Sequence, residues 1–126
     1  MRFISTRTHG VLDYLTGAVF LISPWLFGFA DWTSAQVVPM LVGGGIILVG
    51  LLTAYEFGLV HVFSMKTHLT IDVITGALLV ASPWLFGFAD RVWIPHVVLG
   101  LFEVVTTLMT RTEAGRVPTA TPMHGR

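Results

Sequence analysis

Two pairs of ionisable residues recur with the same spacing inside apolar stretches of the chain. His9 and Asp13 are four residues apart, and His68 and Asp72 repeat that spacing. Residues four apart lie on one face of a helix, so each pair presents an imidazole beside a carboxylate. The two pairs offer four groups that can bind zinc or another divalent metal, exchange protons, or neutralise one another.

A further carboxyl group, Glu103, also lies in an apolar stretch. An ionisable residue inside a membrane span is costly and is a functional candidate by default. Our first interpretation of Glu103 is a buried, neutral acid that is hydrogen-bonded to a threonine or histidine. The alternative is a protonatable group that acts beside the histidine and aspartate pairs.

Long apolar segments must position these groups. Hydrophobic residues make up 54% of the 126-residue chain and charged residues only 11%, against about 25% charged in soluble domains. The apolar segments cover approximately residues 11–30, 36–55, 69–89 and 92–110. A bilayer core of ~30 Å needs about 20 apolar residues in a helix. The chain is therefore predicted to be an all-α membrane protein with four transmembrane helices.

Charge and composition exclude several other classes of protein. The formal net charge is +0 and there is no cysteine. A neutral chain gives no electrostatic indication of nucleic-acid binding, and without cysteine there are no disulfides or thiolate metal sites. The sequence holds no dinucleotide, phosphate-loop, zinc-protease or serine-hydrolase motif. We expect that the chain is not an enzyme.

Basic residues predict the orientation of the chain in the membrane. Only Arg91 lies at one end of a four-span arrangement. The other end carries Arg2, Arg7, Lys66, Arg111, Arg116 and Arg126. Basic residues favour the cytoplasmic side, so both termini and the loop at 56–68 are expected there. The prediction is a multi-pass protein of the cell membrane, with the lipid bilayer as its partner.

An internal repeat divides the chain into two similar halves. Residues 9–31 and 68–90 align without a gap, with 14 of 23 positions identical. The helices that follow align more loosely, with Gly43 opposite Gly100. Each copy contributes two spans, so both copies enter the membrane in the same direction. The expected fold is two tandem parallel helical hairpins related by a pseudo-two-fold axis along the membrane normal.

The repeat also sets the expected domain boundaries. A transmembrane domain at 1–113 contains one repeat at about 8–56 and a second at about 67–113. The remaining residues, 114–126, are expected to form a disordered cytoplasmic tail. We expect the first and third spans to pack against each other at their Gly-Thr positions. Such packing would bring the histidine and aspartate pairs together near the cytoplasmic end.

Each copy carries one Ser-Pro-Trp tripeptide in the first of its two spans. The six residues are Ser23, Pro24, Trp25, Ser82, Pro83 and Trp84. In this respect the sequence resembles the SPW-repeat family of small prokaryotic membrane proteins, over roughly residues 8–110. The resemblance implies an integral membrane protein of two tandem repeats. It implies no particular reaction, substrate or cofactor.

The repeated motif itself has a structural interpretation. Proline near the end of a span can bend or end the helix, and the aromatic residues beside it suit the headgroup interface. Gly28 and Gly87 would allow tight turns, and Asp31 and Asp90 are expected as N-caps of the following helices. An aromatic pocket on the outer side is the alternative. His96, near the outer start of the fourth span, is expected at the interface.

Three functions remain open. The first is a non-enzymatic bundle without a cofactor, in which the cluster of His9, Asp13, His68 and Asp72 holds the helices together and the molecular role stays undetermined. The second is binding or transport of a proton or divalent cation by that cluster. Transport through so small a bundle would require a homo-oligomer. The third is an accessory subunit of a larger membrane complex. Haem ligation by two histidines has no further feature in its favour.

Overall fold

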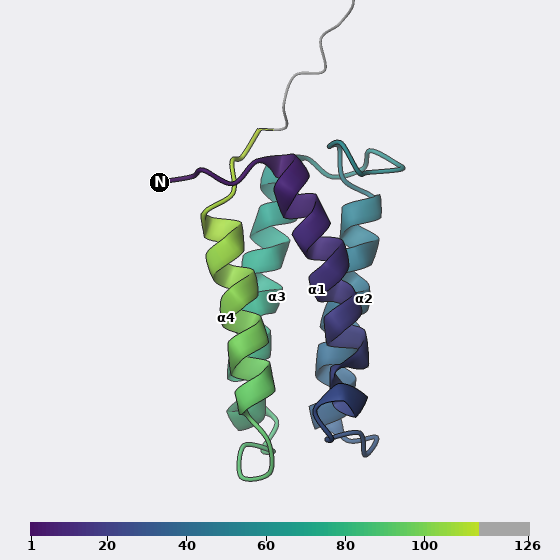
Figure 1. Ribbon diagram of the computed structural model, residues 1–126, viewed down its shortest axis with the longest axis vertical. Helices are drawn as coiled ribbons and strands as arrows, with labels where there is room; N and C mark the ends of the chain where they lie inside the picture. The colour runs from purple at the N-terminus through teal and green to yellow at the C-terminus, as the bar shows by residue number, and fades with distance from the viewer. Residues whose placement is uncertain (114–126) are drawn as a thin grey trace, which may run out of the picture.

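The computed structural model describes residues 1–113 and consists of four α-helices, as expected. They are α1 (Thr6–Leu26), α2 (Ser34–Leu51), α3 (Met65–Leu85) and α4 (Ile94–Leu108). Figure 1 shows four helices side by side, with the N-terminus and the loop between α2 and α3 at one end of the bundle. We call this the N-terminal end. The tail at 114–126, which we expected to be disordered, lies outside the described residues.

The two copies of the repeat begin their first helix in the same way. Ser5 precedes α1 and Ser64 precedes α3. Each serine hydroxyl oxygen accepts a hydrogen bond from the backbone N–H of the residue three positions on, Thr8 or Thr67. Such N-caps satisfy a donor that the first helical turn would otherwise leave unpaired.

These helices also end alike, just after the proline of each Ser-Pro-Trp tripeptide. Gly28 and Gly87 follow the ends of α1 and α3 with φ angles of 76° and 75°. Glycine adopts this left-handed conformation without steric cost. The prediction that both glycines form tight turns is therefore confirmed.

The expected N-caps at Asp31 and Asp90 are wrong. Thr33 precedes α2 and Trp93 precedes α4, so both turns are longer than expected. The Asp31 carboxylate instead accepts hydrogen bonds from the backbone N–H and hydroxyl of Thr33, and it forms an ion pair with Arg91. The hydrogen bond from the Thr33 hydroxyl, together with Arg91, lowers the pKa of Asp31. Asp31 thus joins the two turns instead of capping a helix.

Within each repeat the two helices approach closely at glycine. A Cβ atom built on Gly43 of α2 would lie 2.6 Å from the carbonyl oxygen of Gly17 of α1. The equivalent distance from Gly100 of α4 to the carbonyl oxygen of Gly76 of α3 is 2.7 Å. Distances this short leave no room for a side chain. Glycine therefore sets the spacing of α1 against α2 and of α3 against α4.

The expectation that α1 and α3 pack directly against each other is wrong. The main packing partners are α1 with α2 and α3 with α4, and smaller contacts join α2 to α3 and α1 to α4. One turn joins the two helices of each repeat and keeps them adjacent, so the small residues pack within the repeat. In the described residues α1 and α3 meet through long side chains that cross the interior of the bundle.

The bundle buries many polar side chains and exposes large apolar ones. Buried polar residues include His9, Gln36, His68, Asp72, His96, Glu103 and Thr107. Exposed apolar residues lie on all four helices and include Leu15, Leu41, Ile74, Leu78, Leu101 and Val105. This distribution is the reverse of that in a water-soluble bundle, whose outer faces are polar.

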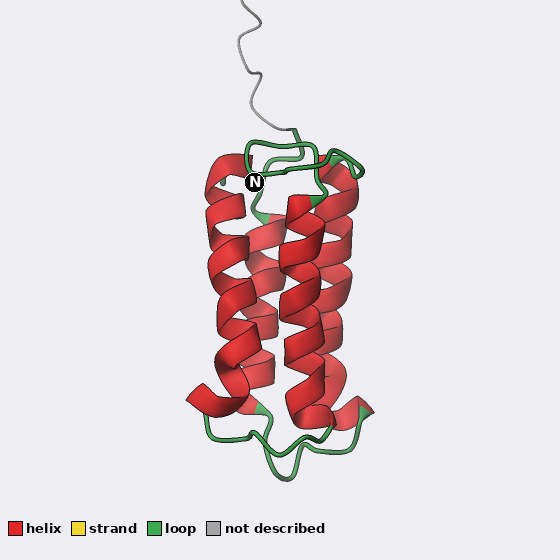
Figure 2. Ribbon diagram, turned by 90° about the vertical axis from the view of Figure 1, so that its right-hand side faces the viewer, coloured by secondary structure: helices red, strands yellow, loops and turns green. Residues whose placement is uncertain are grey.

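Two of the four helices are long and apolar enough to cross a membrane. These helices are α2, with 18 residues, and α3, with 21. The fourth helix is apolar but contains only 15 residues, a length of about 22 Å. Figure 2 shows the four helices running nearly parallel to the long axis, with loops gathered at both ends.

Candidate ion-binding site

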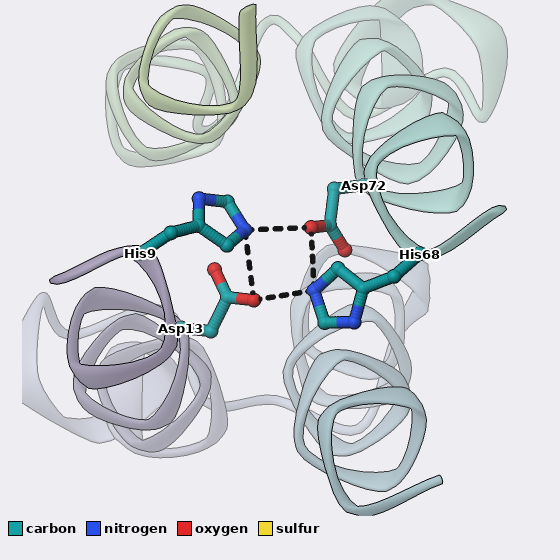
Figure 3. A group of neighbouring side chains, drawn as sticks. All are labelled: His9, Asp13, His68 and Asp72. Atoms are coloured by element: carbon teal, nitrogen blue, oxygen red, sulfur yellow. Dashed lines mark hydrogen bonds and ion pairs between the residues drawn. The ribbon is translucent and has the colours of Figure 1, made fainter. Parts of the chain in front are cut away.

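The structure brings together the four residues of the repeated histidine and aspartate pairs. One candidate ligand atom from each of His9, Asp13, His68 and Asp72 lies within 4.8 Å of all the others. Both residues of α1 face both residues of α3 across the bundle interior, near the N-terminal end (Figure 3). We refer to these four side chains as the His/Asp ring.

The ring is closed by four short contacts between histidine Nε2 and aspartate Oδ2 atoms. Within α1 the distance from His9 to Asp13 is 3.0 Å, and within α3 the distance from His68 to Asp72 is also 3.0 Å. Between the helices, His9 lies 3.1 Å from Asp72 and His68 lies 2.7 Å from Asp13. Each Nε2 atom therefore faces two carboxylate oxygens, and each of those oxygens faces two Nε2 atoms.

All four side chains are removed from solvent. The exposed fraction of the side chain is 2% for Asp13 and 0% for the other three. Ionised groups in such a position are costly unless they are paired or bind an ion. The ring must therefore carry compensating positive charge.

Two threonines fix the orientation of the histidine rings. The Nδ1 atom of His9 lies 2.9 Å from the Thr110 hydroxyl, and that of His68 lies 2.8 Å from the Thr53 hydroxyl. Both hydroxyls also donate to a backbone carbonyl one turn earlier, at 2.7 Å for Thr110 and 2.6 Å for Thr53. A hydroxyl has one proton. Each threonine oxygen must therefore accept the N–H of a histidine Nδ1.

This arrangement determines what faces the centre of the ring. When Nδ1 carries the proton of a neutral imidazole, Nε2 presents a lone pair. Two lone pairs and two carboxylate oxygens would then meet as four acceptors with no donor between them. Either a proton lies between each Nε2 and a carboxylate oxygen, or a cation lies among the four atoms. The two aspartates supply two negative charges, which two protons or one divalent cation would balance.

The residues present fit a divalent transition metal. Imidazole nitrogen and carboxylate oxygen bind zinc at about 2.0–2.2 Å, which places each pair of ligand atoms about 3.3–3.6 Å apart in tetrahedral geometry. The four contacts around the ring, 2.7–3.1 Å, would lengthen by less than about 1 Å on binding zinc, and all four ligand atoms already lie within 4.8 Å of one another. Metal-binding histidines also characteristically donate their second N–H to a neighbouring oxygen. Thr53 and Thr110 provide that second contact.

Thr53 and Thr110 were not among the residues expected from the sequence. Their positions differ by 57, and so do those of Gly43 and Gly100, which already align in the second helices of the two repeats. The signal was therefore present, but hydroxyl residues are common at helix ends. Only the fold shows that each threonine serves the histidine of the other repeat.

Glu103 lies beside the ring and is not part of it. Its side chain is buried, and it interacts electrostatically with all four ring residues. Glu103 was expected to bind a threonine or histidine, but its Oε1 atom has no hydrogen-bond partner among the described residues. The Oδ1 atom of Asp72 and the hydroxyl of Thr107 are also buried without a partner in this part of the chain.

Aromatic side chains border the ring on the side of α2. The centroid of the Tyr55 phenol ring lies 5.7 Å from the centroid of the His68 imidazole. Tyr55 follows α2 in the loop, and burial raises the pKa of its phenol above the ordinary value. The phenol therefore stays protonated and adds no charge to the site.

His96, expected at the interface, is buried inside the bundle near the opposite end. Its Nε2 atom lies 2.8 Å from the carbonyl oxygen of Ala35, to which it donates. The imidazole packs between Phe29 and Phe88, with centroid distances of 5.0 and 4.9 Å. His96 therefore joins the two repeats at this end.

The Ser-Pro-Trp tripeptides form the last turns of α1 and α3. The Ser23 hydroxyl donates to the carbonyl oxygen of Phe20 at 2.8 Å, and Ser82 makes the equivalent bond at 2.7 Å. The serines and prolines are buried, whereas the two tryptophans are more than half exposed. The indole rings thus lie on the outer surface of the bundle.

Comparison with known families agrees with this architecture. The SPW repeat domain matches residues 7–110, a segment that runs from the first turn of α1 past the end of α4. Comparisons with curated proteins and with solved structures gave no significant match. The match covers most of the chain and includes both tripeptides, and the chain therefore belongs to the SPW repeat family.

Proposed function

We propose that this chain is an integral membrane protein whose His/Asp ring binds one divalent cation in exchange for two protons. One observation carries the proposal. Thr53 and Thr110 accept the Nδ1–H of the two histidines, so both Nε2 atoms point at the two carboxylate oxygens. A binding site for a divalent cation requires such a convergence of nitrogen and oxygen lone pairs.

Membrane insertion through all four helices is supported by the distribution of side chains. The exposed faces of the helices carry large apolar residues, including Val11 and Leu15 on α1 and Val98 and Leu101 on α4. Lipid tails can cover such faces, and water cannot do so without cost. The short α4 would then cross with the help of flanking residues or a locally thinner bilayer.

A parallel arrangement of the two repeats is supported by their exchange of contacts. His9 of the first repeat binds Thr110 of the second, and His68 of the second binds Thr53 of the first. A pseudo-two-fold axis along the bundle produces this kind of reciprocal pairing. The N-terminal end, which carries Arg2, Arg7 and Lys66, would face the cytoplasm.

We propose a binding or carrier role without catalysis. The four ligand atoms face one another in a closed ring, so an ion held there would keep little room for a substrate. Transport would further require a path through several chains or a larger membrane complex, because the ring fills the interior of one bundle. Mutual neutralisation of the four residues, with no bound metal, remains the competing role.

The test is the metal content of the full chain, purified in detergent, dialysed against zinc and analysed for bound metal. We expect about one zinc per chain in the parent and none in a His9→Ala/His68→Ala double variant. His61→Ala removes an exposed loop histidine and is the matched control. Glu103→Gln should also retain zinc, because Glu103 is not a ligand.

Two results would oppose the proposal. A parent that stays free of metal, while folded and exposed to zinc, would assign the ring to helix packing. Equal zinc in the parent and in a folded double variant would place the metal elsewhere. Folding of each variant is checked by helix content and by elution of a single species in detergent.

A further inference from the structure

The two repeats differ at one place near the N-terminal end of the bundle. Aligning α1 with α3 by an offset of 59 and α2 with α4 by an offset of 57 puts Tyr14 opposite Val73 and Gly50 opposite Thr107. Beyond α2, the same offset of 57 puts Tyr55 opposite Thr112. Two tyrosines in the first repeat are therefore replaced by smaller residues in the second.

In the first repeat, aromatic side chains fill this space. The Tyr14 hydroxyl donates to the carbonyl oxygen of Phe57 at 2.9 Å. A Cβ atom on Gly10 would lie 2.5 Å from the ring of Tyr55 and 2.7 Å from that of Phe57. Tyr14 and Tyr55 also reach Gly50, whose Cβ would lie 3.4 Å from one hydroxyl and 3.5 Å from the other. These aromatic side chains therefore crowd the space beside Gly10 and Gly50.

In the second repeat the corresponding space is a cavity of about 350 Å³ between α3 and α4. Val73 and Thr112, the counterparts of the two tyrosines, both line it, and so does Leu69, the counterpart of Gly10. The symmetry of the sequence thus identifies this cavity as a difference between otherwise similar halves. Its chemistry indicates what it would hold.

Two cations and three threonines, Thr70, Thr107 and Thr112, are the polar residues that line the cavity. Arg2 and Lys66 line it, and the Arg2 guanidinium is held by a hydrogen bond of 2.7 Å to the carbonyl oxygen of Thr110. Thr107 also lines it and is 1% exposed. Its hydroxyl has no hydrogen-bond partner among the described residues. A buried hydroxyl without a partner is unfavourable and would be satisfied by a polar ligand.

The remaining wall is apolar and continues onto the outer surface of the bundle. Ile74 and Leu108 line the cavity and are 62% and 49% exposed. Ile74 lies on α3, eight residues further from the N-terminal end than Lys66, and Leu108 is the last residue of α4. A ligand that fits must therefore be anionic at the end of the bundle and apolar along the helices. The two cations disfavour entry of a divalent metal by this route.

We propose that the cavity between α3 and α4 binds one anionic phospholipid. Its phosphate would contact Arg2 and Lys66, since basic residues near the cytoplasmic surface attract anionic lipids. An acyl chain would lie along Ile74 and Leu108, and the Thr107 hydroxyl would donate to an ester oxygen. The proposal rests on membrane insertion and does not depend on metal binding by the His/Asp ring.

Native mass spectrometry of the full chain in detergent tests this proposal. We expect one phosphatidylglycerol per chain and little retention of phosphatidylcholine. Lys66→Gln should weaken retention about fivefold. Arg7→Gln is the matched control, because Arg7 is the counterpart of Lys66 in the repeat without a cavity. It should retain the lipid as the parent does.

A second variant tests the cavity itself. Val73→Tyr introduces the residue that fills the equivalent space in the first repeat, and it should abolish retention of phosphatidylglycerol. Zinc binding should persist in this variant, which separates failure of lipid binding from failure of the metal proposal. Arg2→Gln gives an independent measurement if the tyrosine variant does not fold.

The proposal would be overturned by equal losses in Lys66→Gln and Arg7→Gln, which indicate attraction to charge alone. Full retention in a folded Val73→Tyr variant would equally overturn it. Displacement of the lipid by millimolar inorganic phosphate would show that a free phosphate is the ligand. Equal retention of phosphatidylcholine would show a site for acyl chains only.

Discussion

The orientation of two imidazole rings determines what the buried cluster can do. Thr53 and Thr110 each use their only proton on a backbone carbonyl, which leaves an acceptor for a histidine Nδ1–H. Both Nε2 atoms are then directed at Asp13 and Asp72. On the protein surface, two His-Asp contacts would contribute little to stability. In this closed, buried ring the carboxylate charges must be balanced by protons or by a cation.

Replacing one threonine tests this role. Thr53→Val keeps the shape of the side chain but leaves the His68 Nδ1–H without an acceptor, so zinc affinity should fall about 10–100-fold. Thr53→Ser, which keeps the hydroxyl, should restore most of it. The measurement is a zinc titration of the detergent-solubilised chain.

The control is Thr106→Val on α4. The Thr106 hydroxyl also donates to a carbonyl one turn earlier, at 2.8 Å, and it makes no histidine contact within the described part of the chain. Zinc affinity should therefore be unchanged in this variant. Equal weakening by Thr53→Val and Thr106→Val would show that loss of any helix hydroxyl explains the effect.

At the scale of helices, apolar run length and turn residues account for what could be predicted. The four segments and the glycine turns at Gly28 and Gly87 follow from hydropathy and backbone sterics. Which helices pack together does not follow from the sequence, because a stripe of small residues on one helix allows any other helix to approach closely. The N-caps of α2 and α4 also differ from those predicted, because the turns are longer and Asp31 binds Thr33 and Arg91 within the turn.

The closeness of α1 and α2 can be tested with a matched pair of glycines on α2. Gly43→Ala places a methyl group 2.6 Å from the carbonyl oxygen of Gly17 and should destabilise the bundle by about 1–3 kcal/mol. A methyl group on Gly45 would meet no neighbouring atom within 4 Å among the described residues, so Gly45→Ala should be neutral or stabilising.

Thermal unfolding in detergent, followed by helix content, compares the two variants. The expected order of Tm is Gly43→Ala below the parent, and Gly45→Ala equal to or above it. Equal Tm values for both variants would mean that α1 and α2 are further apart in the membrane than in this fold.

At the scale of the whole molecule, the convergence of the ring was predictable and its surroundings were not. The spacing of His9 from Asp13 and of His68 from Asp72, repeated in two copies, predicts that the pairs meet once the copies are parallel. The cavity beside Val73 depends instead on smaller residues in the second copy at the positions of Tyr14 and Tyr55. Such a difference becomes meaningful only when the packing around Tyr14 is known.

The proposed orientation can be tested by labelling single cysteines, because the chain has none of its own. A membrane-impermeant maleimide should label Asp90→Cys in intact cells and label His61→Cys only after permeabilisation. Both positions are exposed and lie in loops at opposite ends of the bundle. Labelling of both in intact cells would contradict a membrane-spanning arrangement, and the reverse pattern would invert the orientation.

The number of protons released on metal binding tests the central claim most directly. Zinc is titrated into the detergent-solubilised chain by calorimetry at pH 7, in buffers that differ in their enthalpy of ionisation. The ring should bind one zinc ion and release two protons, because each Nε2 proton and the metal compete for the same lone pair. Zinc binding without proton release would contradict the exchange, and the absence of any binding would leave the ring as a structural ion cluster.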